Sequence, residues 1–133
     1  MIIRKKLKSK ELIIAFSDKN EGCLTSSELN DCKYTKNSPR YFDWIGGRSA
    51  LKMIITYLNK NLDVTKISFP HPFLSLSHAK GCAVAIGVSN KTNSVKGIGI
   101  DLELNRKVTV EHNRYYLSKY ESDLVKDIDD RLR

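Results

Sequence analysis

A strict alternation of apolar and other residues over positions 95–106, VKGIGIDLELNR, is the feature that most constrains this chain. In an extended strand, successive side chains point to opposite faces of the sheet. One face would carry the apolar residues Ile98, Ile100, Leu102 and Leu104. The other face would carry two glycines and two acids, Gly97, Gly99, Asp101 and Glu103. The alternation therefore predicts a strand with one face buried against a core.

The polar face of this predicted strand suggests a site for a hard cation. Residues two apart on a strand lie about 6.5–7 Å apart, so Asp101 and Glu103 can converge on one ion that prefers oxygen ligands. Gly97 and Gly99 leave room for a bulky group beside that ion. The same residues also have an ordinary interpretation, because acids are common on exposed strand faces and glycines often mark a bulge.

Size and net charge narrow the classes of function. The chain has 133 residues, 41% of them hydrophobic, which suits one domain with a modest core. Its net charge of +8 should attract an anion such as nucleic acid, anionic lipid, a phosphorylated small molecule or an acidic protein. Charge alone does not choose among these. The basic runs carry no interleaved aromatic residues and no nucleic-acid-binding motif, so nucleic acid is not expected as a partner.

The composition also bears on location. The sequence has no run of 18 apolar residues, which predicts no membrane span. The basic segment 1–10 is not followed by the apolar region of a secretory signal. The three cysteines, Cys23, Cys32 and Cys82, show no zinc-ligand spacing, and their odd number favours free thiols over disulfides. A cytoplasmic location is therefore expected.

The main helix is predicted over residues 38–59. Ser38 is a suitable N-cap and Pro39 a suitable first helical residue. An apolar stripe then follows at helical spacing, formed by Tyr41, Trp44, Leu51, Ile55 and Leu58. The pattern predicts a helix that packs one side on the core.

Three residues of this helix call for an explanation. Arg48 falls within the apolar stripe, where an unpaired cation is costly. Either its stem is buried while its guanidinium stays in water, or the guanidinium reaches a phosphate. Gly46 and Gly47 are unfavourable inside a helix and indicate either close packing or a later helix start.

Apolar or alternating runs bounded by turn residues predict three further strands, at 11–17, 73–78 and 82–88. Turns at 79–81 and 90–94 would join the last two of these with 95–106 in a three-strand antiparallel meander. A long helix followed by such a meander is typical of the α+β class.

Shorter helices are predicted around this framework. One begins at Ser26 or Ser27. A second covers 109–117, and a third begins near Lys119, because Ser118 and Glu121 have the spacing of a capping box.

Four pieces of the sequence occur in a familiar order. They are RYFDWIGGRSALK at 40–52, FLSLSHAKGCAVAIG at 73–87, GIGIDLE at 97–103 and YLSKYESDLVKD at 116–127. Together they resemble the Sfp-type 4'-phosphopantetheinyl transferases. That family has a Gly-Arg-x-Ala-x-Lys helix, then Ser-x-Ser-His-x-x-Gly, then Gly-Ile-Asp-x-Glu. The resemblance covers most of the chain from about Pro39 to Asp127.

The resemblance implies an activity and a set of site residues. The family moves the phosphopantetheine arm of coenzyme A onto a serine of an acyl or peptidyl carrier protein, with Mg²⁺ on the diphosphate. Asp101 and Glu103 match the first two magnesium ligands. The positions implied to bind coenzyme A are Arg40, Arg48, Lys52, Ser77 and His78. Carrier proteins of this class are acidic, which suits a chain of net charge +8.

The resemblance also implies one transferase-like domain over 1–133. Residues 1–104 correspond to the first of two similar halves, and 105–133 to the start of the second. The family's second half carries a Trp-x-x-Lys-Glu-Ala helix whose Glu is the third metal ligand, and the 133 residues do not contain this pattern. Three alternatives stay open: a truncated transferase, one part of a split enzyme completed by a second chain or a copy of itself, or an inactive module that binds coenzyme A or a carrier protein.

Overall fold

The computed structural model describes residues 1–7, 10–18, 23–89, 97–103 and 118–120. The chain divides into two compact units, Met1–Glu103 and Leu104–Arg133. In the second unit the described residues are 118–120, of which Lys119 and Tyr120 are helical. The turn predicted at 90–94, the helix predicted at 109–117 and the rest of the last helix lie outside the described residues. Every candidate site residue belongs to the first unit.

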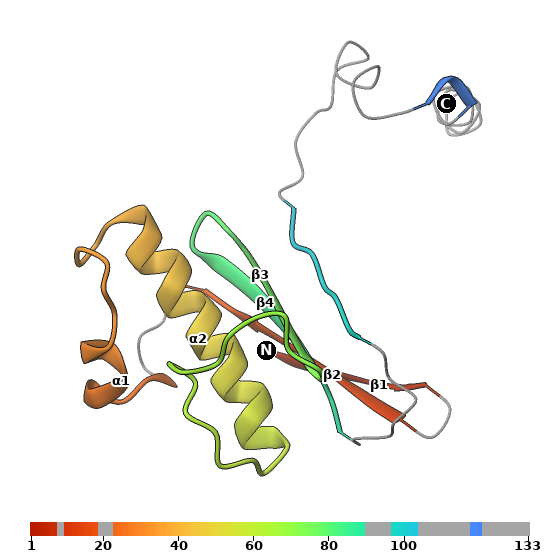
Figure 1. The fold of residues 1–133 in the computed structure, drawn as a ribbon, viewed down its shortest axis with the longest axis horizontal. Coiled ribbons are helices and arrows are strands. Elements are labelled where there is room, and N and C mark those ends of the chain that lie inside the picture. Colours follow the sequence, from red (N-terminus) through yellow and green to blue (C-terminus); the bar gives the residue numbers. More distant parts are fainter. Residues whose placement is uncertain (8–9, 19–22, 90–96, 104–117, 121–133) are drawn as a thin grey trace. The chain divides into compact units, whose positions relative to one another are not determined.

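The first unit is an antiparallel sheet with one long helix packed on it (Figure 1). In chain order the elements are β1 (Ile2–Leu7), β2 (Lys10–Ser17), α1 (Ser26–Asn30), α2 (Pro39–Tyr57), β3 (Leu74–Ala79) and β4 (Cys82–Val88). The order across the sheet is β1-β2-β4-β3, so β1 and β3 form its two edges. The predicted α+β class is confirmed.

The predicted three-strand meander is wrong. Strand β4 has β2 on one side and β3 on the other, which leaves no side of β4 for another strand. Residues 97–103 are not a strand. They lie beside β3, where the Ile100 and Leu102 amides bond side-chain hydroxyls instead of a strand's carbonyl groups. The predicted alternation nevertheless holds, because the apolar residues here are half-buried and the glycines and acids exposed.

Strand β1 was not predicted from the sequence, which was interpreted there only as a basic segment. Residues 2–7 pair with β2 in a register that sets Ile2 opposite Ala15 and Leu7 opposite Lys10. Residues 1–6 are all exposed. A strand of this kind forms through backbone pairing with β2 and leaves no buried apolar stripe in the sequence.

Both described helices begin as predicted. The Ser38 hydroxyl accepts a hydrogen bond from the Tyr41 N–H at 3.1 Å, and Pro39 is the first helical residue of α2. Helix α1 begins at Ser26 behind Thr25, which forms a capping box with Glu28. Side-chain acceptors at these positions satisfy N–H groups that the helix itself leaves unpaired. None of the described helices is long and apolar enough to cross a membrane.

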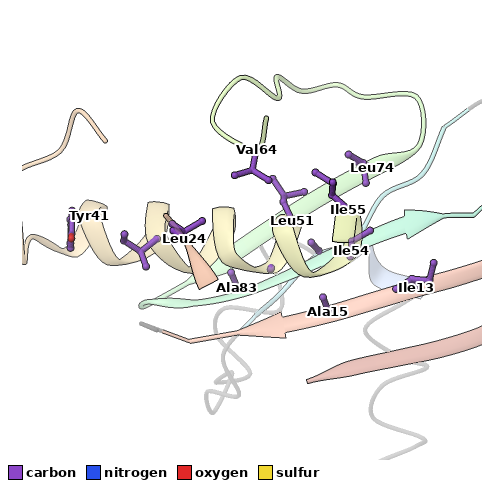
Figure 2. Packing of buried hydrophobic residues seen from close by; sticks show 13 residues of the cluster. Ile13, Ala15, Leu24, Tyr41, Leu51, Ile54, Ile55, Val64, Leu74 and Ala83 are labelled. Atoms are coloured by element: carbon purple, nitrogen blue, oxygen red, sulfur yellow. The ribbon is translucent and has the colours of Figure 1, made fainter. Parts of the chain in front are cut away.

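The main core lies between α2 and one face of the sheet. Figure 2 shows Ile13, Ala15, Ala83 and Leu74 of the sheet beside the helix, and Val64 of the following loop near Leu51. The predicted stripe is partly wrong. The deepest apolar residues of α2 are Ile45, Ala50, Leu51 and Ile54, whereas Trp44 and Leu58 are only half-buried.

Glycines bring the helix close to the sheet. A Cβ at Gly47 would lie 3.1 Å from Leu76 Cδ2, and one at Gly46 would lie 3.3 Å from the Gly81 carbonyl oxygen. Of the two explanations for this glycine pair, close packing is confirmed. On the sheet side, a Cβ at Gly87 would meet Ile54 Cγ2 at 2.6 Å, which is too short for any real contact.

Candidate functional site

Two of the sequence motifs meet at Ser77. The Ser77 hydroxyl donates to Asp101 Oδ1 at 2.9 Å and accepts from the Leu102 N–H at 3.1 Å. The Leu102 N–H also bonds Asp101 Oδ1 at 2.9 Å. A polar cluster of this kind fixes the aspartate carboxylate relative to β3. It joins the Ser-x-Ser-His and Gly-Ile-Asp-x-Glu motifs through Ser77 and Asp101, which are 24 residues apart in the sequence.

A second hydroxyl continues the contact along β3. The Ser75 hydroxyl accepts from the Ile100 N–H at 3.3 Å. Residues 75 and 77 both point to the face of the sheet opposite α2, since side chains two apart share a face. The pairings of 100 with 75 and of 102 with 77 mean that residues 97–103 run parallel to β3.

Asp101 and Glu103 both lie in exposed positions on this segment. Within the part of the chain that the structure describes, no group of three or more His, Cys, Asp and Glu side chains could hold a metal ion. A carboxylate offers about four acceptor positions, and two are used at Asp101 Oδ1. The pair therefore fits a magnesium ion only if most of its oxygens come from water and from a ligand's phosphates.

His78 lies on the other face of β3. It pairs across the sheet with Ala83, whose side chain faces α2. His78 Nδ1 is 4.0 Å from Asp43 Oδ2, and Asp43 Oδ1 accepts from the Gly81 N–H at 2.8 Å. The carboxylate thus ties the β3–β4 turn to α2 and stands beside the imidazole. Sequence reasoning missed Asp43, because only the tertiary fold brings its helix to this turn.

Arg48 is held by the loop that follows α2. Its Nη1 donates to the carbonyl oxygens of Val64 at 2.6 Å and Ile67 at 3.1 Å, and its guanidinium carbon lies 5.9 Å from the Trp44 ring centre. Burial lowers the pKa of Arg48, while Asp63 and Tyr34 oppose that change. Arginine nevertheless stays charged at neutral pH. These bonds give Arg48 a structural role, and its predicted contact with a phosphate stays a prediction.

Lys52 and Arg40 were also predicted to bind coenzyme A. Within the described residues, neither forms a hydrogen bond that connects it to Asp101. Lys52 forms an ion pair with Glu28 of α1. Arg40 is exposed in the first turn of α2. The structure thus brings Ser77 and Asp101 together, places His78 on the opposite face, and directs Arg48 and Lys52 to neighbouring loops and helices.

A cleft of about 310 Å³ opens beside β3, between the strand, residues 97–98 and the loop that precedes the strand. Its lining includes Phe69, His71, Ser75, Leu76 and Gly97. It adjoins the Ser75 end of the hydroxyl contacts. Small-molecule sites typically have volumes of about 300–1,000 Å³, so the cleft is at the lower end of that range.

The cysteines are as predicted. Cys23, Cys32 and Cys82 are all free thiols.

Comparisons of this chain with protein-family models, with curated proteins and with solved structures found no match. The resemblance to the phosphopantetheinyl transferases therefore depends on the sequence motifs themselves.

Proposed function

We propose that this chain is a magnesium-dependent transferase that moves the 4'-phosphopantetheine arm of coenzyme A onto a serine of an acyl or peptidyl carrier protein. The serine oxygen would form the new bond to phosphorus as the diphosphate P–O bond breaks, and adenosine 3',5'-bisphosphate and the hydroxyl proton would leave. The observation that carries the proposal is the bond from Ser77 to Asp101. These residues belong to two different motifs of the resemblance, and both motifs are expected to act on the same diphosphate. Their direct contact supports a common site.

The residues have separate tasks in this proposal. Asp101 and Glu103 hold the ion, and a bound Mg²⁺ would neutralise negative charge on the diphosphate oxygens. Ser77 fixes the Asp101 carboxylate, and His78 binds phosphate oxygens. Because Ser77 and His78 point to opposite faces of an edge strand, a ligand that reaches both lies around the β3 edge.

A second candidate is a module that binds coenzyme A or a carrier protein but lacks activity by itself. The observation that favours it is the two-carboxylate site, since the described residues contain no third metal ligand near Asp101. In this case activity would need a second polypeptide or a second copy of the chain.

The test of the first candidate is the mass of an apo carrier protein after incubation with coenzyme A, Mg²⁺ and this chain. We expect the mass to rise by one phosphopantetheine group, and the rise to be lost in Asp101→Ala. The matched control is Asp18→Ala, which removes an exposed acid that lies outside the motifs. If the carrier mass stays constant while a known transferase modifies it in parallel, the isolated chain is not a transferase.

Calorimetry with coenzyme A distinguishes the second candidate. A binding module should bind coenzyme A more tightly with Mg²⁺ than without it, and Asp101→Ala should remove that difference. Equal binding with and without Mg²⁺ in the unaltered chain would mean that the two carboxylates do not hold the ion.

A further inference from the structure

Strand β1 presents an open edge of the sheet. It is the first strand in the order β1-β2-β4-β3, and among the described residues its one neighbour is β2. Its sequence IIRKKL contains three cations and no acid. Such an edge offers unpaired backbone groups to any extended chain that can approach it.

The direction of those backbone groups follows from the hydrogen bonds at one end of the β1–β2 pair. The Phe16 N–H bonds the Met1 carbonyl at 2.8 Å, and the Met1 nitrogen bonds the Phe16 carbonyl at 3.0 Å. In an antiparallel pair, bonded and non-bonded positions alternate. The backbone groups of Ile3 and Lys5 therefore point toward β2. Those that point outward belong to Ile2, Arg4 and Lys6.

The hydrogen bonds of the neighbouring strand β2 confirm which backbone groups of β1 point outward. The Glu11 carbonyl accepts from the Ser89 N–H at 3.0 Å, so Glu11 directs its backbone away from β1 and toward β4. Glu11 stands opposite Lys6 in the register, which makes this a non-bonded pair. The outward set of Ile2, Arg4 and Lys6 is thus fixed at both ends of the strand.

The charges of the β1 side chains determine which kind of partner the edge attracts. Arg4, Lys5 and Lys6 are exposed, and Glu11 is the one acid in β1 and β2. Arg4 Nη1 donates to the Tyr57 hydroxyl at 2.9 Å and the guanidinium carbon lies 5.8 Å from the centre of that ring, so a partner's acid would meet the remaining N–H groups of Arg4. Ile2 and Ile3 at the other end of the strand are 39% and 44% exposed. A partner strand would therefore meet three consecutive cations followed by two apolar residues.

A second copy of the same strand fits this edge poorly. In antiparallel pairing of β1 with its copy, the outward backbone groups of Ile2, Arg4 and Lys6 can bond each other when Ile2 stands opposite Lys6. This register sets Arg4 opposite Arg4. Like charges directly opposite one another destabilise a strand pair. Lysines at an edge also discourage pairing with similar strands.

We infer that the β1 edge binds an extended acidic segment of a protein partner as an added, antiparallel strand of the sheet. The segment would place three acids opposite Lys6, Lys5 and Arg4, and two apolar residues opposite Ile3 and Ile2. Backbone hydrogen bonds would supply affinity, and the charges would set register and specificity. This inference concerns the edge opposite β3 and does not depend on the proposed transferase activity.

The probe is a fluorescein-labelled peptide, Thr-Glu-Glu-Glu-Val-Ile-Thr, titrated with the full chain and followed by fluorescence anisotropy. Its control is the scrambled peptide Glu-Thr-Val-Glu-Thr-Ile-Glu, which has the same composition and charge. We expect the first peptide to bind at least about fivefold more tightly, because only it can align acids with all three cations. Equal affinities would overturn the inference and indicate non-specific attraction between opposite charges.

A matched pair of variants separates the contribution of a backbone hydrogen bond to peptide binding from that of the side-chain charge. Lys6→Ala removes a cation but keeps the outward N–H, whereas Lys6→Pro removes both. Proline is tolerated on an edge strand where its nitrogen faces solvent. We expect Lys6→Pro to bind the peptide about fivefold more weakly than Lys6→Ala, since one hydrogen bond contributes about 1 kcal/mol. Equal binding by the two variants would overturn strand addition.

N-methylated peptides repeat this test on the unaltered protein, which removes any doubt about the folding of a proline variant. A methyl group on the nitrogen of the third Glu, opposite Arg4, blocks a bond to β1. A methyl group on the middle Glu, opposite Lys5, points away from β1. We expect the first peptide to lose binding and the second to keep it. The inference fails if both peptides bind alike, or if a DNA oligonucleotide competes equally well against every peptide.

Discussion

The two edge strands of the sheet, β3 and β1, differ in the chain segments that contact them. At β3, residues 97–103 run along the strand on the sheet face opposite α2, where two of their amides bond the hydroxyls of Ser75 and Ser77. At the β1 edge, no other described segment pairs with the strand, and its three cations are exposed. The comparison teaches that one edge is tied to a further part of the chain by side-chain hydrogen bonds. The other is kept apart from similar strands by charge.

The two edge strands also contribute unequally to the core. Leu74 of β3 is 1% exposed and belongs to the cluster under α2, whereas residues 2–6 of β1, whose side chains the structure describes, contribute none to it. Local opening requires little free energy where few apolar contacts are lost. We therefore expect β1 to open more readily than β3, and four measurements test this difference.

The largest expected effect is in the core at β3. Leu74→Ala should lower the free energy of unfolding by about 3 kcal/mol, because it leaves a cavity among fully buried neighbours. Ile3→Ala in β1 is the matched control and should cost less than about 1 kcal/mol, since Ile3 is 44% exposed. Urea unfolding followed by circular dichroism measures both. Equal losses would show that β1 is as firmly packed as β3.

The next effect concerns the loop that leads into β3. Arg48→Ala should cost about 2 kcal/mol, because it leaves the Val64 and Ile67 carbonyls without their donor. The same urea experiment measures it, with Arg48→Lys as a control that keeps the charge but not the planar geometry. We expect the free energy of unfolding of Arg48→Lys to lie between those of the unaltered chain and Arg48→Ala. If Arg48→Ala is as stable as the unaltered chain, the loop is held by other contacts.

A smaller effect is expected where residues 97–103 meet β3. Ser77→Ala removes two bonds of the Ser77 hydroxyl, to Asp101 and to the Leu102 amide, whereas Ser75→Ala removes only the longer bond to Ile100. Ser77→Ala should cost about 1 kcal/mol locally and Ser75→Ala about half as much. Hydrogen exchange of the Leu102 and Ile100 amides measures this. Unchanged exchange of both amides, Leu102 in Ser77→Ala and Ile100 in Ser75→Ala, would mean that the serine hydroxyls do not hold the segment.

Local signals in the sequence predicted much of the fold. The cap at Ser38 and the proline at 39 predicted the start of α2, because capping depends on a few adjacent residues. The runs at 73–78 and 82–88 correspond to β3 and β4 with shifts of a residue at most. The α+β class followed from the same patterns.

What depends on distant partners was not predicted. Strand β1 was missed because the side chains of residues 2–6 are exposed and include three cations, so they form no apolar stripe in the sequence. The alternation at 97–103 predicted correctly which residues face inward. It could not predict that serine hydroxyls, not strand carbonyls, accept the Ile100 and Leu102 amides. In the candidate site, the motifs indicated Ser77 and Asp101, but Asp43 reaches the β3–β4 turn only through the packing of α2.

The smallest effect is at Glu28 in α1, which lies on neither edge strand and so provides a baseline for the comparison. Burial of Glu28 favours its protonated form. The hydrogen bond from Lys52, those from Thr25 and the attraction of Lys52 together outweigh this, and the pKa of Glu28 lies below its ordinary 4.5. A carboxyl with a lowered pKa stabilises the fold above the ordinary value, and this contribution is lost as pH falls through the lowered pKa.

Glu28→Gln should therefore reduce stability by about 0.5 kcal/mol at pH 7 and by less as pH falls below 4.5. Urea unfolding of both proteins across that range measures the difference. Hydrogen exchange at Leu102 and Lys5 should stay as it is in the unaltered chain, because the ion pair touches neither edge. A change at one edge alone would show that α1 is coupled to that edge, and the contrast between β1 and β3 would then have a cause beyond their own contacts.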